Sequence, residues 1–523
     1  MHINILYEKY QRGYMLQIDR QSETPLYVQL RDALLRRIEE TPLKAGDRLP
    51  TVTALSRQLG VTATTVRRAL EDLTREGRVV AHVGRGTFVA DPAVSAPERA
   101  IGSFDFKRSP IQPADPHLSL GARRLRRDIG QSLNALQTLA NRPGTIAFTA
   151  GTPDERVATP GILDEMARAT LSKGQGVFQG YGPVAGLPAL REAIAARLSA
   201  SDIPVSPEQV LITSGSQQAV ALLAQYALEE RRRVLCETPC YMGVPQAFEA
   251  LGHWVESVVR DGEGPKMDRI EAASGAGPSL LYLCHEIHNP MGVDLSPARR
   301  AAVLVWARRE NAVIVADEIF RDLRYDPVTR SSFLAESGLD QVVLIGSFSK
   351  SFMCGLRVGY LVTSVERMRT LTALKRAADI SSPPLMQGIA LEVLTSGAYA
   401  AHVERACAHY RERCDALMTA LDEHMPKRVT WTRPVGGFHC WVELPQGYSS
   451  LALFLLAVER GVEIVPGPRL DIDHRFVNGF RLSYGSLDPP AIREGVEMLA
   501  DAVKELLTRP PGEAGMSGLG DFV

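Results

Sequence analysis

The chain has 523 residues, too many for one compact domain, which indicates three or four structural units at about 150 residues each. Its composition of 45% hydrophobic and 23% charged residues, with no apolar run that could span a bilayer and seven scattered cysteines, excludes membrane and disulfide-rich classes and predicts a cytoplasmic globular protein. Residues 1–140 carry 21 Lys and Arg against 15 Asp and Glu, whereas residues 141–523 carry 38 against 45, so a basic first part precedes an acidic body.

Three helical patterns come first along the chain. The first covers Thr24–Glu40 with leucines four apart, the second begins after Thr51 and stops at Gly60, and the third begins at Val61. After Gly77, two short strands surround a glycine-rich tip. Three helices and such a hairpin predict an α+β winged helix-turn-helix domain, which places the end of one helix in the major groove of DNA.

The candidate DNA-binding residues lie on the outer side of the third helix and at the tip of the wing. They are Thr62, Thr64, Arg67, Arg68, Gly84 and Arg85. We expect Arg85 to contact phosphate, since the adjacent glycine at the tip permits a close approach to the backbone of DNA.

The blocks PLYVQLRDAL, LKAGDRLPTVTALSRQLGVTATTVRRALEDL and GRGTFV resemble the GntR-type winged-helix domain of bacterial repressors. Two positions differ from that family, since Thr53 and Ala63 stand where it usually places arginines that resemble DNA contacts. This difference leaves open a winged helix that serves only protein contacts.

Residues 93–140 read as a linker. Pro, Ala, Ser and Asp alternate there without a sustained period, and the basic cluster Arg123–Arg127 is interpreted as a solvated turn.

From about Thr145, short apolar runs alternate with longer helical stretches. Buried strands are expected at 210–213, 232–237, 279–284, 312–318 and 341–347, and helices at 187–198, 216–228 and 297–308. This alternation predicts an α/β fold with a mostly parallel sheet between helices, and a ligand at the carboxyl ends of its strands.

Residues that suit a planar, phosphate-bearing cofactor follow these strands. They are a phosphate cradle at a helix start (Ser214, Gly215, Ser216 and Gln217), a ring-stacking Tyr241, polar ring partners Asn289 and Asp317, and, after the last strand, Ser347, Ser349, Lys350 and Arg357. A pyridine aldehyde with a phosphate arm needs this set, because lysine forms a Schiff base with the aldehyde and a carboxylate keeps the ring nitrogen protonated.

The blocks YGPVAGLPALREAIA, TSGSQQAV, SFSKSFMCGLRVGY and RLSYG resemble the fold-type-I aminotransferases of classes I and II, which use pyridoxal 5'-phosphate (PLP). The resemblance implies a large α/β domain, a smaller α+β domain and Lys350 as the Schiff-base lysine. It makes Asp317 the partner of the ring nitrogen, Asn289 the partner of O3′ and Tyr241 the stacking ring. Ser214–Gln217, Ser347, Ser349 and Arg357 match phosphate contacts, Tyr181 matches a tyrosine that reaches the partner subunit's phosphate, and Arg481 matches the arginine that binds the substrate carboxylate.

Phe320 differs from that family, which usually has a tyrosine there that donates to O3′. We therefore expect slow or partial aminotransferase chemistry at most. His285 and His288 form an HxxH pair without a nearby third ligand, so we expect no metal.

A GntR-type head on an aminotransferase-like body resembles the MocR subfamily of transcriptional regulators, which implies a head-to-tail homodimer. We expect a PLP-dependent, DNA-binding regulator that senses an amino acid or amine effector. The alternatives are an active aminotransferase with a DNA-binding head, which Asn289 and Arg481 favour, and a head used for protein contacts. The expected organisation is an extension (1–16), the winged helix (17–92), the linker (93–140), the PLP-binding domain (141–508) and a tail (509–523).

Overall fold

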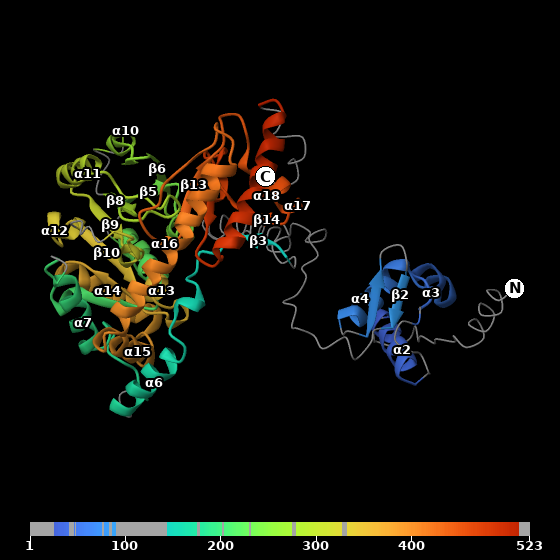
Figure 1. Ribbon diagram of the computed structural model, residues 1–523. Helices are drawn as coiled ribbons and strands as arrows, with labels where there is room; N and C mark the ends of the chain where they lie inside the picture. Colours follow the sequence, from blue (N-terminus) through green and yellow to red (C-terminus); the bar gives the residue numbers. More distant parts are fainter. Residues whose placement is uncertain are drawn as a thin grey trace. The chain divides into compact units, whose positions relative to one another are not determined.

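The chain forms two units, one within residues 1–105 and one within residues 106–523 (Figure 1). Each unit has its own hydrophobic core. The computed structural model describes residues 26–40, 47, 49–75, 78–82, 86–89, 144–174, 178–200, 203–229, 232–272, 274, 279–326 and 332–511. The predicted N-terminal extension, the linker with Arg123–Arg127, and residues 512–523 lie outside this part of the chain.

The described residues of the first unit form three helices followed by a two-stranded antiparallel sheet. Its elements are α2 (Leu26–Glu40), α3 (Val52–Leu59), α4 (Ala63–Arg75), β1 (Val79–His82) and β2 (Gly86–Val89). Leu30, Leu55 and Leu73 are among the buried residues that hold the three helices together. The order of these elements confirms the prediction of a winged helix-turn-helix.

Local side chains set the ends of the two central helices of this unit. Thr51 accepts a hydrogen bond from the Ala54 amide at 3.2 Å before α3, and Gly60 ends that helix in the left-handed conformation. The third helix begins two residues later than predicted. Thr62 stays outside it as a cap, because its hydroxyl accepts from the Thr65 amide at 3.2 Å.

The second unit is built on an eight-stranded sheet with the strand order β4-β11-β10-β9-β8-β5-β6-β7. The bounds are β4 (Val210–Thr213), β5 (Arg233–Thr238), β6 (Val255–Asp261), β7 (Gly264–Pro265), β8 (Ser279–Leu283), β9 (Val313–Asp317), β10 (Val342–Ser347) and β11 (Gly359–Val362). Strands β10, β9, β8, β5 and β6 pair in parallel, whereas β11 and β7 run antiparallel to their neighbours. The five predicted strands are confirmed to within one residue, and β6, β7 and β11 are additions.

Helices cover both faces of this sheet. Successive side chains of a strand point to opposite sides, so the apolar strands present side chains that pack against helices on each face. Ile212 and Ile314 pack on one face, and their neighbours Leu211 and Val313 pack on the other. Helices on the first face include α6 (Ile162–Lys173), α7 (Pro188–Ser199), α11 (Pro297–Arg309), α12 (Phe333–Ser337) and α15 (Pro384–Thr395), and those on the second are α8 (Ser216–Glu229), α9 (Gly243–Ala250) and α14 (Val365–Asp379). The predicted α/β architecture is therefore confirmed.

A smaller α+β part completes the second unit, around a four-stranded sheet with the order β12-β13-β16-β15. Its elements are α16 (Ala398–His424), β12 (Thr430–Trp431), β13 (His439–Glu443), α17 (Ser450–Glu459), β14 (Val462–Glu463), β15 (Val465–Pro466), β16 (Gly479–Ser483) and α18 (Pro489–Thr508). Strand β14 pairs in parallel with β3 (Ile146–Ala147), so the first described segment of the unit is attached to this smaller part.

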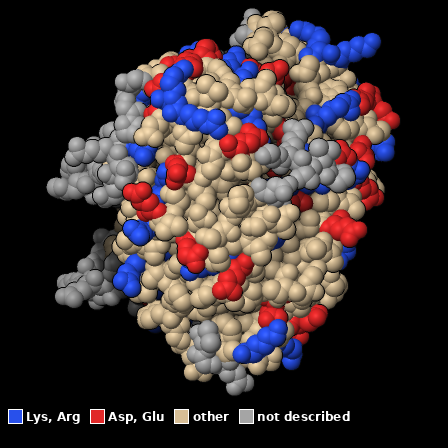
Figure 2. Space-filling model, turned by 90° about the vertical axis from the view of Figure 1, so that its left-hand side faces the viewer, with Lys and Arg blue, Asp and Glu red and all other residues tan. Residues whose placement is uncertain are grey.

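On the face drawn in Figure 2, the coloured acidic and basic side chains are interspersed among uncharged residues. No helix among the described residues is long and apolar enough to cross a membrane.

Candidate cofactor site and DNA-binding face

The carboxyl ends of β4, β5, β8, β9 and β10 lie at one edge of the large sheet, because these strands run in the same direction. Predicted site residues follow all five strands, and Tyr241, Asn289 and Asp317 line one pocket there. The structure thus brings together side chains that are up to 76 residues apart in the chain.

Asp317 ends β9 and is buried at this pocket. Burial raises its pKa to about 6, although hydrogen bonds from the Tyr282 hydroxyl and from the Ile319 amide at 3.0 Å oppose the rise. At neutral pH the carboxylate form therefore predominates, and its oxygens can accept a hydrogen bond from a protonated ring nitrogen. Tyr282 was not predicted from the sequence as a site residue. Its only signal in the sequence is a tyrosine among the leucines of β8.

Lys350 lies on α13 (Phe348–Ser351), directly after β10. Its amine donates to the carbonyl oxygen of Gly151 at 2.6 Å. Burial lowers the pKa of Lys350, and the nearby charge of Arg481 lowers it further. A larger fraction of this amine is therefore neutral, and hence nucleophilic, than for an exposed lysine.

Arg481 on β16 is 8% exposed and reaches the same edge from the smaller part of the unit. Its Nη1 donates to Asn289 Oδ1 at 3.2 Å and its Nη2 to the carbonyl oxygen of Thr149 at 3.1 Å. Nε is buried without a hydrogen-bond partner among the described residues. Burial lowers the pKa of Arg481 to about 10. In the described part of the chain, neutral oxygens alone hold this buried guanidinium, an arrangement that suits an incoming carboxylate.

The residues predicted as a phosphate cradle, Ser214–Gln217, lie between the end of β4 and the first turn of α8. Arg357 Nη2 donates to the carbonyl oxygen of Ser214 at 3.0 Å. Gly215 has φ +80°, and a Cβ there would lie 2.7 Å from Arg357 Nη2, so the arginine needs a glycine at this position. The amide of Ser214 is already engaged with Gln218 Oε1 at 2.7 Å. The amides in the first turn of a helix have no partner within that helix, so the start of α8 at Ser216 suits an anion.

The other cradle residues differ in what they contact. The side-chain amide of Gln217 donates to the Gly243 carbonyl at 2.8 Å. Ser347 Oγ accepts from the Ser349 amide at 3.1 Å. The Ser349 hydroxyl is buried without a partner among the described residues. Such a group costs about 1–3 kcal/mol unless a ligand or water satisfies it, so Ser349 fits a phosphate oxygen.

Tyr181 and Tyr241 are 84% and 49% exposed, respectively.

Phe320 is buried and packs edge-on against Phe438 and His439, with ring centroids 5.3 and 5.5 Å away.

The two histidines of the HxxH pair face different carboxylates. His285 lies 3.4 Å from Glu318, and His288 lies 3.6 Å from Glu237. Burial lowers the pKa of both imidazoles well below its ordinary value.

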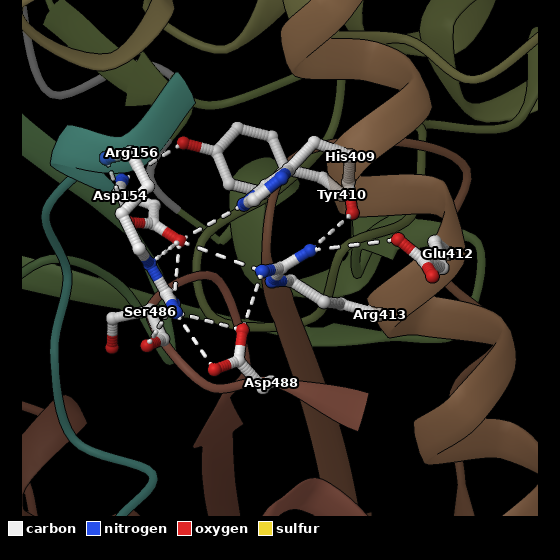
Figure 3. A network of polar contacts seen from close by, with 8 residues as sticks. All are labelled: Asp154, Arg156, His409, Tyr410, Glu412, Arg413, Ser486 and Asp488. Carbon is white, nitrogen blue, oxygen red and sulfur yellow. Dashed lines mark hydrogen bonds and ion pairs between the residues drawn. The ribbon is translucent and has the colours of Figure 1, made fainter. Parts of the chain in front are cut away.

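A polar network anchors the segment that carries the Thr149 and Gly151 carbonyls (Figure 3). Asp154 accepts from Arg156 at 2.8 Å and from His409 Nε2 at 2.9 Å. Asp488 bridges Arg156 and Arg413, at 2.7 and 3.0 Å. The network joins η2 (Glu155–Val157), α16 and the loop before α18, and was not foreseen from the sequence.

On the first unit, the structure describes part of the predicted DNA-binding face. Thr62 is exposed at the start of α4, and the Arg68 guanidinium lies 3.8 Å from the centre of the Tyr27 ring. The side chains of Thr64 and Arg67 on α4, and the wing residues Gly84 and Arg85, lie outside what is described.

Residues 143–499 match the family model of class I and II aminotransferases. The chain belongs to this family. Residues 26–89 also match the model of bacterial regulatory proteins of the gntR family, so both resemblances inferred from sequence are confirmed.

Known proteins match either the body or nearly the whole chain. LysN, an α-aminoadipate aminotransferase from Thermus thermophilus solved with N-(5'-phosphopyridoxyl)-L-leucine, is 34% identical with a TM-score of 0.66, over 73% of this chain and 97% of its own. The uncharacterized HTH-type transcriptional regulator YisV of Bacillus subtilis is 28% identical over 94% of this chain and 98% of its own. The probable rhizopine catabolism regulatory protein MocR of Rhizobium meliloti is 26% identical over 93% and 96%.

Proposed function

We propose that this family member is a PLP-dependent transcriptional regulator whose winged helix binds DNA and whose aminotransferase-like body senses an amine-bearing effector. The observation that carries the proposal is the presence, in one chain, of a winged-helix domain and of a body of the aminotransferase family, in which Tyr241, Asn289 and Asp317 line one pocket. Relatives that match over more than nine tenths of this chain are named as regulators, which supports this function over that of a simple enzyme. Since a regulator acts on chromosomal DNA, the proposal implies a cytoplasmic protein.

The residues of the site fit PLP. Arg357, the Ser349 hydroxyl and the first turn of α8 would hold its phosphate, Tyr241 would cover the ring and Asn289 would bind O3′. When bound, PLP supplies an aldehyde for amines and an electron-withdrawing ring. Asp317 would hold the proton of the ring nitrogen, and Lys350 presents an amine whose pKa is lowered by burial at the same edge of the sheet.

Arg481 indicates that the effector carries a carboxylate. It is a buried guanidinium that is held, among the described residues, by neutral oxygens alone, and it lies near Lys350. A carboxylate that displaced those oxygens would satisfy it with two parallel hydrogen bonds. An amino acid has both a carboxylate for Arg481 and an amine, which makes amino acids the effector class that this site suits best.

An active aminotransferase is the second candidate. Asn289 and Arg481 favour it, because by resemblance they bind the cofactor's O3′ and the substrate carboxylate, and the two side chains are hydrogen-bonded to each other. Phe320 argues against it, because it brings no hydroxyl to O3′. A winged helix used only for protein contacts is the third candidate and rests on Thr53 and Ala63.

A head-to-tail homodimer is part of the proposal. Tyr181 is 84% exposed, which suits a side chain that reaches the phosphate of a partner subunit. Light scattering on the purified chain tests the dimer, and Tyr181→Phe should then weaken PLP binding.

The deciding experiment measures binding of the full chain to a labelled fragment of its own upstream region, with and without PLP and amino acids. We expect sequence-specific binding that PLP alters, and a Lys350→Ala protein that still binds DNA without responding to PLP. Absence of specific binding together with turnover of ~1–1000 s⁻¹ on an amino acid and keto acid pair would favour the aminotransferase.

A further inference from the structure

A fully buried lysine lies behind the phosphate cradle, outside the set of residues considered so far. Lys375 on α14 has no exposed surface. Its ammonium donates to both carboxylate oxygens of Asp379 at 2.8 Å, to the Ser382 hydroxyl at 3.0 Å and to Gln218 Oε1 at 3.3 Å. Lysine is almost never fully buried unless it is paired, because removing an ammonium from water is costly.

The groups that Lys375 contacts are the ones that hold Ser214. Gln218 Oε1 accepts from the Ser214 amide at 2.7 Å, and the Ser214 hydroxyl donates to Ser382 Oγ at 3.3 Å. The Ser214 carbonyl accepts from Arg357 at 3.0 Å. All three polar groups of Ser214 are therefore engaged, two of them through direct partners of the lysine.

The lysine also determines which way the Gln218 amide points. Gln218 Nε2 donates to Asp379 at 2.6 Å, so Oε1 is left to accept from both Lys375 and Ser214. Without the ammonium, one reason for this orientation is lost, and a flipped amide would present N–H groups to the Ser214 amide. The turn between β4 and α8 would then lose its fixed geometry.

We infer that Lys375 is a positioning residue for the phosphate arm of the cofactor, acting through Gln218 and Ser382 on the Ser214 turn. This inference rests on the proposed use of PLP. It concerns the phosphate alone, since no group of this network contacts Lys350, Asp317 or Asn289 in the described part of the chain. Loss of Lys375 should weaken binding of the phosphorylated cofactor and spare the unphosphorylated aldehyde.

The test titrates the full-length apoprotein with PLP and, separately, with pyridoxal, and follows the visible absorption of the bound aldehyde. In Lys375→Met we expect the affinity for PLP to fall by about tenfold or more, as for a lost hydrogen bond to a charged group, and that for pyridoxal to stay within about twofold. The phosphorus resonance of bound PLP should also move toward that of free PLP.

Gln218→Met is the second variant, because it removes the link to Ser214 while leaving the pair of Lys375 and Asp379 in place, and it should show the same selective loss. Lys173→Met is the matched control, since Lys173 is 67% exposed and pairs with Glu392 at 2.8 Å away from this network. Equal losses for PLP and pyridoxal, or no loss in a folded Gln218→Met protein, would overturn the inference. A wild-type protein that binds neither aldehyde would instead refute the proposed function.

Discussion

Lys350 donates its amine hydrogen to the carbonyl oxygen of Gly151 at 2.6 Å, across 199 residues of sequence. Two residues earlier, the carbonyl oxygen of Thr149 accepts from Arg481 at 3.1 Å. One short segment therefore supplies the acceptors for both the lysine and the arginine of the site. A cofactor and a carboxylate ligand would compete with these two backbone carbonyls.

Capture of PLP by Lys350 should occur at a lower pH than for an ordinary lysine. Burial and, to a smaller extent, Arg481 lower the pKa of this amine from its ordinary 10.5, and only the neutral amine reacts. The rate at which the visible band forms should therefore reach half its maximum below pH 10.5. Arg481→Ala should move this midpoint upward, because it removes a like charge. A reducible adduct at full yield in Lys350→Ala would contradict the assignment of the lysine.

Arg481→Ala should keep PLP binding but abolish the spectral change that a carboxylate-bearing amine causes in the wild type. The reason is that Arg481 is a buried arginine on β16 at this edge, whereas the lysine and the phosphate cradle lie on other elements. Spectra with an amino acid and with its decarboxylated amine measure the effect. Arg509→Ala, at an exposed arginine paired with Glu505, is the control and should behave as wild type. A persistent response in Arg481→Ala would mean that another group binds the carboxylate.

Asp317→Asn should stabilise the protein without cofactor at pH 8. Burial raises the pKa of Asp317 from 3.8 to about 6. Between pH 3.8 and pH 6, the carboxyl group is therefore protonated in the folded state and ionised in the unfolded state. Stability from this group is present at low pH and falls as pH rises through 6, by at most about 3 kcal/mol. Thermal unfolding at pH 8 and pH 4.5 measures this. The gain of the variant should be larger at pH 8, and the reverse order would show that burial does not dominate this site.

Asp154→Asn should lower the stability of the second unit at neutral pH. Although burial opposes ionisation, hydrogen bonds from Arg156 and His409 lower the pKa of Asp154 from 3.8 to about 2. Its contribution, about 2 kcal/mol, is therefore present above pH 4 and lost as pH falls toward 2. The difference in melting temperature between the variant and the wild type should shrink over that range. Asp164→Asn, at an exposed pair with Arg168, is the control with little expected effect.

DNA binding by the first unit should depend strongly on salt. Each phosphate contact contributes about 0.9 to the slope of log affinity against log salt concentration. Arg67→Ala and Arg85→Ala should each weaken binding and reduce this slope by about that amount. Anisotropy titrations at several salt concentrations measure it. Slopes equal to that of the wild type would assign both arginines to roles other than phosphate contacts.

Motifs contiguous in sequence were predictable because their signals are local. Thr51 marks the start of α3 by accepting a hydrogen bond with its side chain, and Gly60 marks the end of α3 by its left-handed backbone conformation. Residues that follow a buried strand could be chosen as site candidates, because each strand has a local signal and parallel strands end at one edge of the sheet. Tyr282 was missed because it lies within a strand, and the carbonyls of Thr149 and Gly151 have no side-chain signal at all.

The sequence by itself determined the two-part organisation, the types of residue that follow each strand and their order along the chain. The tertiary structure alone decided which of them meet. Strand β11 enters the sheet antiparallel between β4 and β10 and brings Arg357 to Ser214, and β16 carries Arg481 to Asn289 across 192 residues. The physical reason is that hydrophobic periodicity specifies which face of an element is buried, while its neighbours depend on the packing of the whole sheet.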